Sequence, residues 1–184
     1  IYKSDDYVPH DTEKAIKHLT IAAKANNSNA YFELGMIYCF DIYGLFNINK
    51  AIYYLVEAAK RYNQKAEIML GIIYIEGIYI PRDIDKGIYY LTLAANQNNS
   101  LAQSYLGYIY NSNQFVKRDI NKAMYYFTIS ANQNDPLALF QLGMIYLLGI
   151  DIKRDINKAI KYLTNSANQN EQFAQYTLGY LYIN

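Results

Sequence analysis

The chain has 184 residues, which allows one or two domains, and its formal net charge of +1 argues against a general phosphate-binding surface. Cys39 is the only cysteine, so an internal disulfide is excluded. A single thiol suits a reducing compartment, which slightly favours the cytoplasm. The longest apolar stretch, residues 68–80, contains Glu76 and is shorter than the roughly 20 residues that a membrane span needs. We therefore expect no membrane-spanning segment.

One phrase, Leu-Gly-x-x-Tyr, recurs along the whole chain without insertion or deletion. Its glycine returns every 36 residues, at Gly35, Gly71, Gly107, Gly143 and Gly179. A fixed period of about 20 to 50 residues is typical of a repeat array, which presents an extended surface rather than one catalytic pocket. Both ends of the sequence cut the repeat at the same phase, so we expect a fragment of a longer array or of a larger protein.

The first predicted helix of each repeat begins after a residue that can cap it. In the copy over 83–99, Asp83 is the predicted N-cap, and apolar residues follow at helical spacing. The equivalent caps in the other copies are Asp11, Asn47, Asp119 and Asp155. This helix then reaches an asparagine, a residue that tolerates the left-handed backbone at helix ends. These asparagines are Asn26, Asn98, Asn134 and Asn170, while Tyr62 holds the place in one copy and fits less well.

The second predicted helix of each repeat carries the recurring glycine. Its predicted caps are Asn27, Asn63, Asn99, Asp135 and Glu171, and Pro136 falls at the first helical position, where proline is tolerated. A glycine inside a helix costs about 1 kcal/mol relative to alanine, so its recurrence indicates that another helix approaches closely there. We expect this second helix to stop at residues that tolerate a left-handed turn. These stop positions are Asp41, Gly77, Asn113 and Gly149. Two short helices per repeat predict an all-α solenoid.

These residues resemble the Sel1-like repeat, a relative of the tetratricopeptide repeat. The family phrase is roughly Ala-x-x-x-Leu-Gly-x-x-Tyr-x-x-Gly, then Asp-x-x-Lys-Ala-x-x-Tyr-x-x-x-Ala-Ala, and residues 66–95 and 138–167 follow it. The resemblance covers about residues 2–184, which we expect to form a single array. Its complete units are 28–63, 64–99, 100–135 and 136–171, with half-units at 1–27 and 172–184. Departures from the family phrase are Gly87 for Ala, His18 for Tyr, and Asp41 and Asn113 for the second Gly.

The resemblance implies a right-handed α-solenoid of antiparallel helix pairs, with the Leu-Gly-x-x-Tyr helices lining its concave face. Family members mostly act as scaffolds or adaptors that bind proteins or peptides. The predicted partner-binding residues, at fixed offsets from the glycine, are Phe32, Met36, Ile68, Ile72, Ile75, Tyr108, Phe140, Met144, Leu147, Tyr176 and Tyr180. These helices are apolar nearly all round, which is typical of buried helices. Three interpretations stay open: packing between repeats, a groove for a partner helix or peptide, and self-association.

Two tyrosine columns mark the first helix of each repeat. Tyr54, Tyr90, Tyr126 and Tyr162 match a packing column of the family, and His18 stands in the same column. The adjoining column is Lys17, Tyr53, Tyr89, Tyr125 and Lys161. Because tyrosine is favoured at interfaces, this second column is a candidate aromatic stripe on the convex face.

The sequence predicts no catalytic residue, metal site or cofactor. Its nucleophile and base candidates are Cys39, His10 and His18, and we expect Cys39 to be a buried apolar residue and His18 to be structural. No Cys/His cluster has metal-site spacing, and no P-loop or dinucleotide glycine pattern occurs.

A non-catalytic interaction scaffold is therefore the first hypothesis for function. The alternatives are a non-catalytic repeat segment of a larger enzyme, such as a kinase or hydrolase, and a structural subunit of a large assembly. Some helical repeats near this period read RNA one base at a time, but their phrase differs and this chain is almost neutral. We therefore predict a protein or peptide partner and no nucleic acid.

Overall fold

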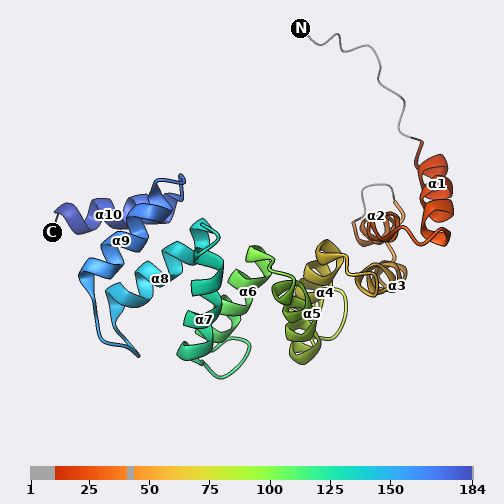
Figure 1. Ribbon diagram of the computed structural model, residues 1–184. Coiled ribbons are helices and arrows are strands. Elements are labelled where there is room, and N and C mark those ends of the chain that lie inside the picture. The colour runs from red at the N-terminus through yellow and green to blue at the C-terminus, as the bar shows by residue number, and fades with distance from the viewer. Residues whose placement is uncertain (1–10, 41–43, 184) are drawn as a thin grey trace, which may run out of the picture. The chain divides into compact units, whose positions relative to one another are not determined.

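The computed structural model describes residues 11–40 and 44–183, and it holds ten α-helices and no strand in these ranges (Figure 1). The all-α prediction is confirmed. The chain forms two compact units, residues 1–70 and 71–184, so each is treated by itself. The helices are α1 (Thr12–Lys24), α2 (Ser28–Cys39), α3 (Ile48–Ala59), α4 (Gln64–Glu76), α5 (Ile84–Asn96), α6 (Ser100–Asn111), α7 (Ile120–Ala131), α8 (Pro136–Leu148), α9 (Ile156–Ala167) and α10 (Gln172–Ile183).

Every predicted N-cap in both helix series is confirmed by a side-chain hydrogen bond. Asp83 Oδ1 accepts the backbone N–H of Lys86 at 3.0 Å, and Asn99 Oδ1 accepts that of Ala102 at 3.1 Å. In the same way, a cap side chain accepts the backbone N–H of the residue three positions later at Asp11, Asn27, Asn47, Asn63, Asp119, Asp135, Asp155 and Glu171. Each cap satisfies one backbone donor that the first turn leaves free, so local sequence fixes where the helices begin.

The predicted left-handed helix ends are confirmed with one correction. Asn26, Asn98, Asn134 and Asn170 all have φ between 60° and 71°, and the stop residues Gly77 and Gly149 have φ of 63° and 62°. Asn113 does not take this conformation. Helix α6 already ends at Asn111, and Asn113 Oδ1 instead accepts the backbone N–H of Arg118 at 3.0 Å. Asp41 lies outside the described residues.

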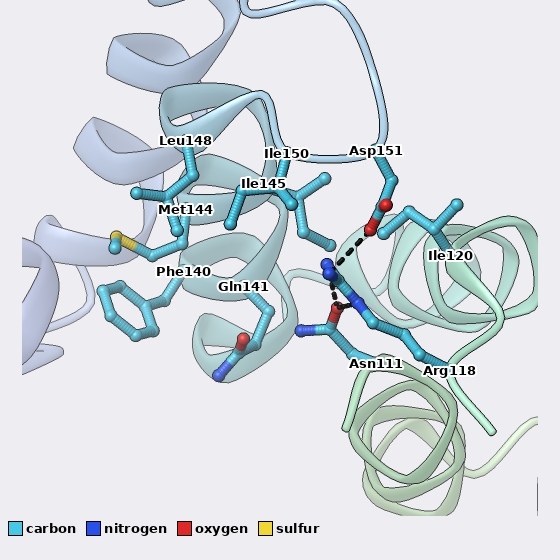
Figure 2. A pocket seen from close by; sticks show the side chains of 10 residues that line it. All are labelled: Asn111, Arg118, Ile120, Phe140, Gln141, Met144, Ile145, Leu148, Ile150 and Asp151. Atoms are coloured by element: carbon cyan, nitrogen blue, oxygen red, sulfur yellow. Dashed lines mark hydrogen bonds and ion pairs between the residues drawn. The ribbon is translucent and has the colours of Figure 1, made fainter. Parts of the chain in front are cut away.

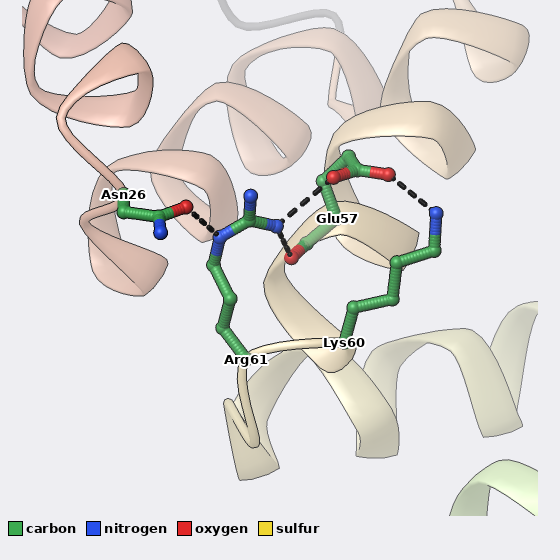
Figure 3. A network of polar contacts seen from close by, with 4 residues as sticks. All are labelled: Asn26, Glu57, Lys60 and Arg61. Carbon is green, nitrogen blue, oxygen red and sulfur yellow. Dashed lines mark hydrogen bonds and ion pairs between the residues drawn. The ribbon is translucent and has the colours of Figure 1, made fainter.

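Arg61, after the end of α3, contacts the turn between α1 and α2 (Figure 3). Its Nε donates to Asn26 Oδ1 at 2.7 Å, and its Nη1 donates to the carbonyl and carboxylate of Glu57 at 2.6 and 2.9 Å. Lys60 pairs with the same carboxylate at 2.6 Å. Hydrogen bonds from Lys60 and then Arg61 lower the pKa of Glu57 below its ordinary value. This network ties two consecutive repeats together.

Tyr62 follows Arg61 and is held at φ 58°, a left-handed conformation that costs most L-residues about 1–2 kcal/mol. Its side chain is 79% exposed, so the ring contributes little packing. We expect Tyr62→Asn to raise the free energy of unfolding by about 0.5–1 kcal/mol, because asparagine accepts this conformation. Urea unfolding followed by circular dichroism measures the change. Tyr53→Asn, at an exposed helical position, is the matched control and should give no gain.

Four of the five recurring glycines lie where a second helix meets the first helix of the next repeat; the exception is Gly179 on α10. A Cβ added at Gly71 would lie 2.6 Å from Leu91 Cγ, and one at Gly143 would lie 2.7 Å from Leu163 Cγ. The predicted close approach is therefore confirmed. Gly87, which departs from the family alanine, has the same cause: an added Cβ would lie 2.5 Å from Cγ1 of Ile75, a branched side chain.

The core of each unit is built from the repeated leucine and alanine positions. In the first unit Leu34, Leu55 and Ala58 are fully buried. In the second unit the largest fully buried side chains are Leu91, Leu106, Ile109, Phe127, Leu142 and Leu163. Burying a leucine or phenylalanine side chain contributes about 1.5–3 kcal/mol, so this periodic core stabilises each unit.

Candidate interaction surface

In four of the five Leu-Gly-x-x-Tyr phrases the tyrosine packs within the chain, whereas Tyr182, in the fifth, is 71% exposed. Tyr74 stacks on Tyr90 with ring centroids 5.9 Å apart and planes inclined by 4°, and Lys86 Nζ lies 5.3 Å from the Tyr74 centroid. The same arrangement recurs at Tyr38–Tyr54 with Lys50, Tyr110–Tyr126 with Lys122, and Tyr146–Tyr162 with Lys158. Aromatic stacking and cation–π contact each contribute about 0.5–1.5 kcal/mol. These columns are therefore structural, as expected for Tyr54, Tyr90, Tyr126 and Tyr162.

Burial in these stacks raises the pKa of Tyr90 and Tyr126 above the ordinary value of 10.0. A raised pKa in the folded state means that folding favours the neutral phenol. The resulting stability is fully present below about pH 10 and is lost as the pH rises through the higher folded value.

We expect the free energy of unfolding to fall as the pH is raised above about 10. Urea unfolding at several alkaline pH values measures it, and the near-ultraviolet absorbance of tyrosinate reports the titration. Tyr90→Phe should weaken the pH dependence because phenylalanine cannot ionise. An unchanged free energy of unfolding across the tyrosine titration would contradict the expectation.

The adjoining column faces solvent. Tyr53, Tyr89 and Tyr125 are all exposed. Each ring makes an edge-to-face contact with the ring of the tyrosine that follows it, with ring centroids 5.2 Å apart. His18 is exposed as well, unlike the tyrosines of its column. Cys39 is buried as expected, and this burial raises the pKa of its thiol.

The predicted partner-binding residues divide into three groups by exposure. Ile68 and Ile75 are buried, at 8% and 4% exposed, so packing within the chain accounts for them. Phe32, Met36, Ile72, Phe140, Met144 and Leu147 are half-buried. Tyr108, Tyr176 and Tyr180 are exposed. The second helices are thus neither wholly core nor wholly surface.

Three second helices, α6, α8 and α10, contain no Asp, Glu, Lys or Arg. On α6 and α8 several apolar side chains that the sequence analysis did not select are exposed: Leu101, Tyr105, Leu137 and Leu148. A sequence signal for two of them exists. The repeat position of Leu101 and Leu137 is polar in the earlier copies, as Asn29 and Lys65, and then becomes apolar.

A pocket of about 260 Å³ opens beside α8 (Figure 2). Phe140, Met144 and Leu148 line one side, and Arg118 stands at the other. Arg118 Nη1 pairs with Asp151 Oδ2 at 2.6 Å, while its Nη2 and Nε donate to Asn111 Oδ1 at 3.1 and 3.3 Å. The guanidinium is thus already paired, and it ties the loop before α7 to the loop before α9.

A second pocket, of about 220 Å³, lies between α6 and α8 and shares Gln141 with the first. We call it the Ser104 pocket. Its lining residues are Leu101, Ser104, Tyr105, Tyr108, Phe127, Leu137 and Gln141. The Ser104 hydroxyl lies 2.9 Å from the hydroxyl of Ser130 and donates to Asp135 Oδ1 at 2.9 Å. The two pockets hollow the surface of α6 and α8, helices that carry no charged residue, and the Arg118–Asp151 ion pair lies at the edge of this face.

Within residues 11–40 and 44–183, no three His, Cys, Asp or Glu side chains are placed to hold a metal ion. Among the helices that the structure describes, none is both long enough and apolar enough to cross a bilayer.

Comparison with known proteins places the repeats. The sequence profile of the Sel1 repeat matches residues 1–27, 28–63, 64–99, 100–135 and 136–171. The chain belongs to the Sel1 repeat family. No curated protein gives a match.

Solved Sel1 structures share the fold. A Sel1 repeat protein from Oxalobacter formigenes is 30% identical with a TM-score of 0.81, and the match covers 95% of this chain and 71% of that one. A protective antigen of uropathogenic Escherichia coli strains, displaying an SLR fold, is 26% identical with a TM-score of 0.85. That match covers 91% of this chain but only 36% of the antigen. An immunity protein from Pseudomonas aeruginosa, 18% identical with a TM-score of 0.52, covers 92% and 77% and shows the fold alone.

Membership of the Sel1 family lets the copies be compared position by position. Ser104 occupies a column whose other members are Phe32, Ile68, Phe140 and Tyr176. Phe127 occupies a column whose other members are Leu19, Leu55, Leu91 and Leu163. The Ser104 pocket thus arises in the one Sel1 repeat where a small residue replaces a large one.

Proposed function

We propose that this Sel1 repeat chain is a non-catalytic scaffold that binds a partner protein through the face formed by α6 and α8. The observation that carries the proposal is the combination of exposed apolar side chains and absent charge on these two helices. Tyr108 is 45% exposed and Leu137 50%, and Leu101 and Tyr105 lie beside them around one pocket. Contiguous exposed apolar surface usually marks an interaction site.

The chemistry of this face supports a peptide or helix rather than a nucleic acid as the partner. Tyrosine side chains offer a large apolar area together with a hydroxyl, and they are enriched at binding hot spots. A phosphate backbone would require a series of basic side chains, and α6 and α8 contain none. Arg118, at the edge of the face, is already paired with Asp151 and Asn111.

The experiment is affinity capture from native lysate with three baits. Circular dichroism first establishes that the three baits are equally folded. The baits are the wild-type chain, the double variant Tyr105→Ser/Tyr108→Ser, and the control Tyr89→Ser/Tyr125→Ser, which alters two exposed tyrosines of the first helices. The proposal expects a protein whose recovery falls about tenfold or more with the first variant and stays unchanged with the control. Equal recovery on all three baits would contradict it. Concentration-dependent dimerisation lost in the first variant would indicate self-association instead.

A further inference from the structure

We propose that the Ser104 pocket receives one uncharged apolar side chain of the partner, of leucine or phenylalanine size. This inference rests on the proposed function and names the chemistry that the α6–α8 face recognises. In effect, the partner supplies the large side chain that this Sel1 repeat lacks at position 104.

The first step of the argument is the comparison between repeats. Four copies carry a phenylalanine, isoleucine or tyrosine in this column, and only the third carries serine. Ser104 is itself buried, and its hydroxyl is already committed to Ser130 and Asp135. The Ser104 hydroxyl is therefore not free to bind a polar ligand, and no side chain of residues 11–40 or 44–183 fills the space beside it.

The second step is the size and floor of the pocket. Phe127, which replaces leucine, forms the floor of the pocket with only 1% of its surface exposed. The volume of the pocket is about 220 Å³. An apolar cavity of roughly 150 Å³ is already large enough to bind benzene, so a leucine or phenylalanine side chain fits. An aromatic floor also offers edge contacts to an incoming ring.

The third step is the absence of charge in the lining. Leu101, Leu137, Tyr105 and Tyr108 form the walls, and Gln141 and Ser104 are the polar members. A charged side chain entering this pocket would lose its hydration, which is strongly unfavourable without an ion partner. The Asp135 carboxylate, which contacts Ser104, does not line the pocket, and its Oδ1 already accepts the Ser104 hydroxyl and the Ala138 N–H. The pocket therefore selects apolar side chains and rejects charged ones.

The test uses the whole chain and amino-acid amides as probes. N-acetyl-leucinamide and N-acetyl-phenylalaninamide are titrated against isotope-labelled protein, with N-acetyl-lysinamide as the charged comparison. The inference expects saturable shifts at the Leu101 and Leu137 methyl groups and the Ser104 amide with the apolar probes alone. Failure of both apolar probes to shift these signals, or an equal response to the lysine probe, would overturn it.

Two matched variants locate the binding. Leu137→Glu places a carboxylate at the pocket mouth in the first turn of α8, where the helix dipole favours it, so the variant should fold. Phe173→Glu makes the same kind of change at the same repeat position of α10, outside the pocket. We expect the dissociation constant, followed at the Ser104 amide, to rise about tenfold or more in the first variant and less than about twofold in the second.

Equal weakening in both variants, or in neither, would contradict assignment of the site to the Ser104 pocket. These outcomes are independent of the capture experiment. If Tyr105→Ser/Tyr108→Ser loses its captured protein while the probes fail, the α6–α8 face binds a partner but the Ser104 pocket is not its anchor. If capture also fails, the proposed function fails with it.

Discussion

Replacing Phe127 with alanine is expected to lower the free energy of unfolding by about 3–5 kcal/mol, the usual cost of deleting a buried phenylalanine. The ring is almost completely buried and packs in one cluster with Ala123, Leu139, Leu142 and Ile145. Its removal leaves a cavity, because the surrounding side chains relax only partly to fill the space. Urea unfolding followed by far-ultraviolet circular dichroism measures the loss.

The control for this variant is Tyr125→Ala, two residues earlier on the same helix. Tyr125 is exposed, so its truncation should cost no more than about 1 kcal/mol. In repeat arrays each repeat contacts only its neighbours, so the loss at Phe127 should appear first in α6 to α9 by hydrogen exchange. A loss below about 1 kcal/mol for Phe127→Ala would contradict its central role in this core.

The second large effect is expected at the recurring glycine. Alanine is normally about 1 kcal/mol more favourable than glycine inside a helix. At Gly107, however, an added Cβ would lie 2.6 Å from both Cδ1 and Cε1 of the Phe127 ring and 2.9 Å from its Cγ. The buried ring has no free end that can move aside, so we expect Gly107→Ala to lower the free energy of unfolding by about 1–3 kcal/mol.

Gly179→Ala provides the matched control, because no atom of the described residues beyond the helix itself lies within 4 Å of a Cβ added there. It should gain up to about 1 kcal/mol from helix propensity alone. In the double variant Gly107→Ala/Phe127→Ala the cavity accepts the new methyl group, so the two losses should not add. If Gly107→Ala and Gly179→Ala shift stability in the same direction and by the same amount, close helix packing is not the reason for the glycine.

The sequence by itself determined the repeat, the helix boundaries and the family. Asp83 and Asn99 cap helices by accepting the backbone N–H of the residue three positions later. Asn98 reverses the chain because its backbone takes the left-handed conformation. These are local interactions, completed within a few residues, so a single copy encodes them and repetition makes them visible. Asn113 is the exception: its place in the stop column with Gly77 and Gly149 predicted a left-handed turn, but its side chain accepts a hydrogen bond from the backbone N–H of Arg118 instead.

Only the tertiary structure decided which apolar side chains are core and which are surface. Ile75 and Tyr108 both belonged to the predicted binding set, yet Ile75 is buried against Gly87 and Tyr108 is exposed. Leu101 and Leu137 were missed. The second helices are apolar nearly all round, so the periodicity of the sequence does not show which face of the helix is buried. Exposure depends instead on which neighbouring helix covers each face. The Ser104 pocket has the same origin: a serine leaves a hollow only because the helices around it are held in place by the rest of the repeat.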